Sequence, residues 1–70
     1  MKKHILWKNT YSQETGYVGK VSKKEGHFIN ADKEHAKSYA SDKFAEKEIA
    51  LLEEMGEGKG KNNIFEIVEF

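Results

Sequence analysis

The stretch SDKFAEKEIALLEEM, residues 41–55, decides the fold because its apolar side chains recur with helical spacing. Ser41 or Asp42 supplies the N-cap, and Gly56 is expected to end the helix in a left-handed conformation. At the 3.6-residue helical repeat, the apolar side chains fall on an arc of about 160°. They are Phe44, Ala45, Ile49, Leu51, Leu52 and Met55. This pattern predicts a helix that packs against one side of a small sheet.

Three short strand-forming segments precede this helix. They are rich in β-branched and aromatic residues and lie at His4–Thr10, Tyr17–Ser22 and His27–Asn30. Residues with turn preference separate them, and Gly16 and Gly26 are suited to positive φ in the two connecting loops. The three segments are therefore expected to form a meander.

A fourth strand, Asn62–Phe70, follows a flexible loop at residues 56–62. Glu66 and Glu69 are its only charged residues, so both of its faces are apolar, which predicts a strand inside the sheet. The sequence thus predicts a single α+β domain over residues 1–70. A small antiparallel or mixed sheet of three to four strands packs against one helix, in the order β-β-β-α-β.

Two local features leave alternatives open. Residues 31–40 are either a short helical turn capped by Asp32, with Ala36 and Tyr39 turned inward, or a loop with an extended stretch near Tyr39. We favour the turn. Glu48 falls inside the apolar arc, where an unpaired carboxylate is costly. It either pairs with a lysine or histidine of the first two strands or lies beside a gap in the sheet, and both roles are favoured over contact with a partner.

Composition argues against catalysis. The chain has no cysteine, which excludes disulfides, cysteine-ligated zinc and thiol nucleophiles. The stretch GEGKGK, residues 56–61, lacks the spacing and the strand-to-helix context of a phosphate-binding loop. A core of this size leaves no room for a deep substrate cavity. We expect no enzyme activity, no catalytic residues, no cofactor and no metal site.

The formal net charge is zero, but the charge is unevenly placed. Residues 1–24 hold six lysines and one acid, whereas residues 25–70 hold six lysines and eleven acids. Aromatic side chains at Trp7, Tyr17 and Phe28 could share a sheet face near Lys8, Lys20, Lys23 and Lys24. A basic, aromatic sheet face is typical of proteins that bind single-stranded nucleic acid. The chain has no arginine, however, so nucleic-acid binding by the basic N-terminal hairpin is the alternative function.

The segment A-x-x-x-x-A-x-x-[FY]-x-S before the helix and the ending FEIVE, residues 65–69, carry a resemblance. The chain resembles small uncharacterised proteins carried by phages and prophages of low-GC Gram-positive bacteria. The resemblance implies a cytoplasmic protein of the infected host that binds and blocks a host protein, including defence systems such as CRISPR effectors. It implies no cofactor and no site residues.

Two surfaces are candidates for binding a partner protein. The hairpins offer Tyr11, Tyr17, Lys23 and Lys24, and the outer helix face with its following loop offers Glu46, Glu53, Glu54 and Glu57. The acidic surface would dock on a basic, nucleic-acid-binding surface of its target. With no apolar run long enough to cross a membrane, no membrane partner is expected. The chain is a monomer or a homodimer, and we favour the monomer.

Overall fold

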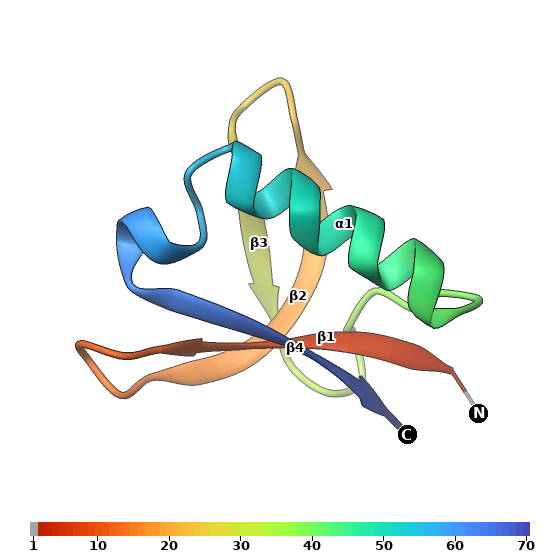
Figure 1. Cartoon of the computed structure of the whole chain (residues 1–70). Helices are drawn as coiled ribbons and strands as arrows, with labels where there is room; N and C mark the ends of the chain where they lie inside the picture. The colour runs from red at the N-terminus through yellow and green to blue at the C-terminus, as the bar shows by residue number, and fades with distance from the viewer. Residues whose placement is uncertain (1) are drawn as a thin grey trace.

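The computed structural model describes residues 2–70 and confirms the predicted α+β architecture (Figure 1). Its elements are β1 (Lys3–Asn9), β2 (Thr15–Ser22), β3 (His27–Ala31), α1 (Asp42–Glu54), a 3-10 turn η1 (Lys59–Lys61) and β4 (Asn63–Glu69). The four strands form one antiparallel sheet in the order β3-β2-β1-β4. The helix packs on one face of this sheet, against β1 and β4 (Figure 1).

Strand β1 is the centre of the sheet. Its residue Ile5 is fully buried and pairs with Ile67 of β4, while Leu6 pairs with Tyr17 of β2. Strand β4 has β1 as its single neighbour and therefore lies at an edge. The expectation that β4 is internal is wrong. Apolar residues on both faces of a strand indicate that other groups pack above and below the sheet, but they do not indicate that the strand has a neighbour on each edge.

The helix is confirmed almost to the residue. Gly56 has φ 85°, and a Schellman motif closes the C-terminus, with Gly56 N donating to Glu53 O and Glu57 N donating to Leu52 O. Ala45 and Leu52 are fully buried. Phe44, expected in the apolar arc, is 56% exposed because it lies at the margin of that arc. Ser41 occupies the N-cap position without a side-chain hydrogen bond to the helix.

The two hairpin glycines have different roles. Gly26 adopts φ 76° in the β2–β3 loop, as expected. In the β1–β2 loop the positive φ belongs to Gln13, at 66°, while Gly16 lies within β2. A Cβ on Gly16 would lie 2.8 Å from Nε1 of Trp7, so this position needs a glycine for space. The predicted turn role of Gly16 is therefore wrong.

Residues 32–40 combine features of both proposed conformations. Asp32 caps a single turn, where its Oδ1 accepts a hydrogen bond from His35 N at 2.9 Å. The chain then becomes extended, and Tyr39 bridges to Lys3 of β1, its N donating to Lys3 O at 2.8 Å. Tyr39 is buried, as the turn interpretation required, but its backbone follows the extended interpretation.

Glu48 joins this segment to the helix. Its side chain is 16% exposed, and its Oε1 accepts hydrogen bonds from Lys37 Nζ at 2.7 Å and from the Tyr39 hydroxyl at 3.3 Å. The predicted structural pairing with a lysine is confirmed. That lysine, however, comes from residues 32–40 and not from the first two strands.

Truncation of Leu52 tests the packing of the helix. Leu52→Ala should lower the free energy of unfolding by about 2–5 kcal/mol, because it leaves a cavity in a fully buried position. Phe44→Ala is the matched control and should cost much less, since its side chain is largely exposed. Urea denaturation measures both, and equal losses would contradict the packing described.

The raised pKa of Tyr39 predicts that the protein loses stability in alkaline solution. Burial raises the pKa of Tyr39, and the Glu48 carboxylate raises it further. The pKa of Tyr39 is higher in the folded state than in the unfolded chain. The contribution of Tyr39 to the free energy of unfolding is therefore complete below about pH 10 and is lost as the pH rises further. Between pH 8 and 11, the urea midpoint should fall more steeply for wild type than for Tyr39→Phe. Parallel pH profiles would rule this contribution out.

Candidate protein-binding surface

The predicted hairpin residues do not form one surface. Tyr11 lies in the β1–β2 loop and is 87% exposed, whereas Lys23 and Lys24 lie exposed in the β2–β3 loop. These loops are at opposite ends of β2 (Figure 1). Tyr17 is half-buried in the middle of the sheet. Any contact through these four residues would involve separate regions of the molecule.

The predicted acidic residues also divide. Glu46, Glu53 and Glu54 are exposed on α1. Glu57 is only 6% exposed, and its Oε1 accepts a hydrogen bond from Lys61 Nζ at 2.7 Å. A buried carboxylate that is already paired with a lysine is not available to a partner, so Glu57 does not extend the acidic face of the helix.

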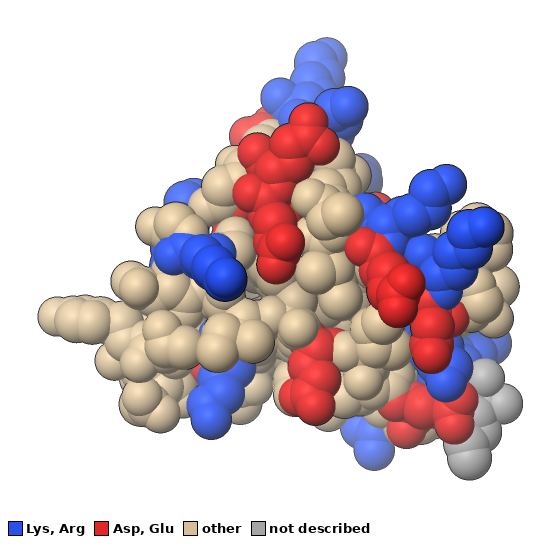
Figure 2. Space-filling model, viewed as in Figure 1, with Lys and Arg blue, Asp and Glu red and all other residues tan. Residues whose placement is uncertain are grey.

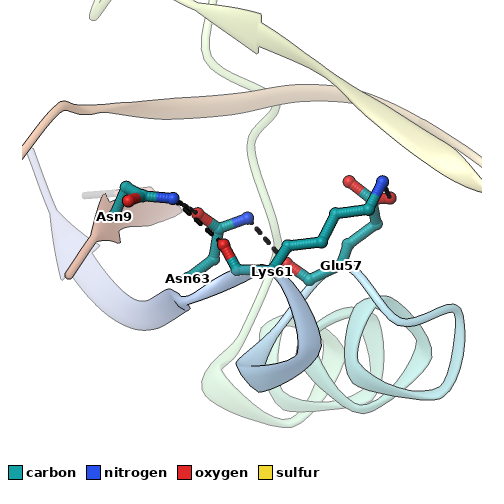
Figure 3. Close-up of polar contacts among 4 residues, drawn as sticks. All are labelled: Asn9, Glu57, Lys61 and Asn63. Atoms are coloured by element: carbon teal, nitrogen blue, oxygen red, sulfur yellow. Dashed lines mark hydrogen bonds and ion pairs between the residues drawn. The ribbon is translucent and has the colours of Figure 1, made fainter. Parts of the chain in front are cut away.

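Glu57 belongs to a network that fixes the start of β4 (Figure 3). Its carbonyl oxygen accepts a hydrogen bond from Asn63 Nδ2 at 2.7 Å. Asn9 Nδ2 in turn donates to Asn63 Oδ1 and to the carbonyl of Lys61, each at 3.0 Å. The segment between α1 and β4 is thus tied both to itself and to β1.

The face of the sheet opposite α1 is apolar, and we call it the outer face. Side chains alternate along a strand, so the neighbours of buried Ile5 in β1 and of core-packed Phe65 and Ile67 in β4 point away from the helix. The outer face comprises His4, Leu6, Tyr17, Ile29, Ala31, Ile64, Glu66, Val68 and Phe70, with Lys8 at one margin. Ile29 and Ile64 are 53% and 55% exposed.

Aromatic contacts organise one end of the outer face. The Phe70 ring stacks on His4 with 4.0 Å between ring centroids, and Tyr17 meets Phe70 edge-on at 5.3 Å. Lys33 Nζ lies 4.8 Å from the centroid of the same ring. The His4 Nδ1 is 3.1 Å from the carbonyl oxygen of Lys37, which fixes the orientation of the imidazole. This end of the outer face is therefore held in one arrangement.

Three other aromatic side chains of the strands lie on the helix side of the sheet. Trp7 and Phe65 each meet Phe28 edge-on, at 6.2 and 5.7 Å, and Trp7 Nε1 donates to Asn30 Oδ1 at 2.9 Å. Trp7 and Phe28 therefore share a face as the nucleic-acid interpretation required. Tyr17 does not join them, because it lies on the outer face with Phe70.

Strand β4 presents unpaired backbone groups at its free edge. Thr10 N bonds to Asn62 O and Phe70 N bonds to Lys2 O, so the even-numbered residues of β4 face β1. The N–H and C=O groups of the odd-numbered residues point outward. Asn63 N is already bonded to Gly58 O at 2.9 Å. Phe65, Ile67 and Glu69 remain, and in residues 2–70 no hydrogen bond engages their outward backbone groups. We call these three residues the β4 edge.

Acidic side chains border the β4 edge. Gly58, which bonds Asn63 at this edge, also lies against Glu53, so the side of α1 that carries Glu53 adjoins the edge. Glu46 and Glu53 are exposed on this side of the helix, and exposed Glu66 projects from the outer face. From the viewpoint of Figure 1, acidic side chains lie over the helix and below it, with uncharged surface between them (Figure 2).

Three ion pairs, two of them with Lys3, stabilise carboxylates elsewhere. Lys3 Nζ lies 2.7 Å from Glu69 and 3.3 Å from Asp42, and the hydrogen bond from Lys3 lowers the pKa of Glu69. The hydrogen bond from the His35 side chain lowers the pKa of Asp32. Glu66, in contrast, has no ion-pair partner in the part of the chain that the structure describes.

The described residues offer a surface for binding and no enclosed site. Residues 2–70 contain no pocket and no cluster of three histidine or acidic side chains placed to hold a metal ion. His27 pairs with Glu25 at 2.9 Å, and His35 pairs with Asp32. Sequence reasoning considered the hairpins and the helix as partner-binding surfaces and did not consider the outer face. The apolar residues on both faces of β4 were the sequence feature that indicates an apolar outer face.

The one described helix is too short and too polar to cross a bilayer. No protein-family model, curated protein or solved structure matches this chain.

Proposed function

We propose that this chain is a small protein-binding domain, encoded by a phage, that inhibits or modulates a host bacterial protein by steric occlusion. The observation that carries protein binding is the largely apolar outer face of the sheet, which α1 does not cover and which the structure leaves partly exposed. The helix packs on the opposite face, which leaves Ile29 and Ile64 more than half exposed. Contiguous apolar surface of this kind marks sites where proteins associate.

The energetics favour a protein partner for this face. Removing apolar surface from water stabilises a complex by about 25 cal/mol per Å². Leu6 pairs with Tyr17 across β1 and β2, and Val68 pairs with His4, the residue next to Leu6 on the same face of β1. A partner that covers them gains this contribution without ordering a flexible segment, because the strands already hold these side chains in place.

The phage context comes from the resemblance of the segments 31–41 and 65–69. An anti-defence inhibitor, such as an anti-CRISPR protein, needs no active site, because it blocks access to the surface it covers. The acidic side chains of α1 suit a target whose surface binds nucleic acid and is therefore basic. Charge complementarity of this kind mainly raises the association rate.

Nucleic-acid binding is the competing function, and the lysines of the β2–β3 loop are its best support. Lys23 and Lys24 are exposed, but the aromatic side chains near the sheet divide between two faces. A stacking platform needs several aromatic rings on one accessible face beside the cations. The outer face therefore supports protein binding better than nucleic-acid binding.

Capture from a nuclease-treated lysate of a low-GC Gram-positive host tests the proposed function. Immobilised wild type should retain a host protein that mass spectrometry identifies. Ile64→Asp should lose that protein, because it places a charge at one of the two most exposed apolar positions of the outer face. Phe44→Asp is the matched control, since Phe44 is equally exposed but lies on the helix, and it should retain the protein.

Three results would contradict protein binding by the outer face. Retention that disappears after nuclease treatment, or that is lost with Lys23→Glu and Lys24→Glu but not with Ile64→Asp, would favour nucleic-acid binding. Equal capture by Ile64→Asp and wild type would show that the outer face is not the contact. Circular dichroism should confirm that each variant is folded, as exposed substitutions usually change stability little.

A further inference from the structure

We propose that the β4 edge binds an extended, basic segment of the partner protein, which adds to the sheet as a fifth strand. This inference rests on the proposed function, because it specifies how a protein partner docks. The bound segment would hydrogen-bond to the outward backbone groups of Phe65, Ile67 and Glu69. A lysine or arginine on that segment would lie beside Glu66.

The backbone supplies the first argument. Outward N–H and C=O groups at three alternate residues match the hydrogen-bonding pattern of one added antiparallel strand. Such a strand would make about six backbone hydrogen bonds, two for each of these residues. Asn63 is already bonded to Gly58, so pairing begins at Phe65. The position of the added strand is thereby limited to the C-terminal part of β4.

Charge complementarity identifies the occupant. Glu66 is exposed on the outer face between Ile64 and Val68 and has no ion-pair partner in residues 2–70. On the other side of the edge, Glu46 and Glu53 line the adjoining face of α1. An added strand would therefore lie between acidic groups on both sides. A segment with a cation flanked by apolar residues, at alternate positions, fits Glu66 and its two apolar neighbours.

A second copy of this chain fits the same edge poorly. Pairing two β4 strands about Glu66 would set one Glu66 against the other, and like charges directly opposite are destabilising. Pairing about Ile67 avoids that contact but still gathers both sets of acidic side chains at one interface. Charges on an edge strand commonly oppose self-association in this way. The β4 edge thus favours a basic partner over itself.

The other free edge is less suited to an added strand. Strand β3 has five residues, and its pairing with β2 shifts register between Val18 and Val21. An irregularity of this kind increases twist and discourages pairing at the edge. Lysines rather than acids lie in the adjoining β2–β3 loop. We therefore place the added strand at β4 alone.

Nuclear magnetic resonance with model peptides tests this assignment. The first probe is a capped nine-residue peptide of alternating threonine and valine whose central valine is replaced by lysine, and the second carries glutamate at the same position. Titration of the 15N-labelled protein with the lysine peptide should shift the amides of Phe65, Ile67 and Glu69. The glutamate peptide should bind roughly threefold or more weakly, as expected for a cross-strand charge pair. Glu66→Lys should reverse this preference.

Several outcomes would overturn the proposal. These are no shift at the β4 edge with either peptide, shifts confined to β3, or equal affinity for the two peptides with Glu66→Lys having no effect. Sedimentation of the free protein tests whether a second copy of this chain occupies the edge. A dimer in which the amides of the β4 edge are protected would overturn the proposal. The two proposals fail separately. If a host protein is captured in an Ile64-dependent way but neither peptide binds, only strand addition is refuted. If a peptide binds but no host protein is captured, the proposed function is refuted.

Discussion

The pairing of β1 on both of its edges is the constraint on which the rest of the structure depends. Strand β4 lies along its whole length, β2 pairs with its second half, and residue Tyr39 bridges to Lys3 where β2 is absent. Ile5, at the centre of β1, is fully buried with Leu52 and Ala45 of the helix. A chain of 70 residues has few such residues, so one central strand must organise the whole core.

The ties around β1 explain why short irregular segments hold fixed positions. Glu48 bonds Lys37 and Tyr39, which fastens residues 32–40 to the helix. The hydrogen bond from Asn63 Nδ2 to the carbonyl oxygen of Glu57 holds the segment between α1 and β4 in place. These contacts add polar links to the apolar core, in which Tyr39 packs with Ala45 and Leu52 of the helix. Part of the outer face and the β4 edge stay exposed, and the proposed partner binds there.

Much of the fold was predictable from local patterns. The helical repeat of residues 41–55, the left-handed Gly26 and the order of elements all depend on interactions between residues close in sequence. The errors concern long-range relations. The edge position of β4 depends on which strands pair, and the place of Gly16 beneath Trp7 depends on a contact across strands. Glu48 was expected to pair with a lysine or histidine of the first two strands, but its partner Lys37 belongs to residues 32–40, whose path local patterns did not predict.

The candidate surface was less predictable for the same reason. Exposure of Glu46, Glu53 and Glu54 follows from helical periodicity, whereas burial of Glu57 depends on the turn that brings Lys61 to it. The outer face combines residues from all four strands, so no single segment indicates it. Apolar residues on both faces of β4 were the available sign, and the structure shows them divided between the core and the outer face.

Amide hydrogen exchange of the free protein tests the central claim most directly, because it reports whether β4 is bonded on one edge only. The amides of Ile64, Glu66 and Val68 face β1 and should exchange slowly, while those of Phe65 and Ile67 should exchange quickly. This alternation would establish β1 as the one neighbour of β4 and leave its outer edge open to a partner. Uniform protection along β4 would contradict the account, since it would require a second strand already bound at that edge.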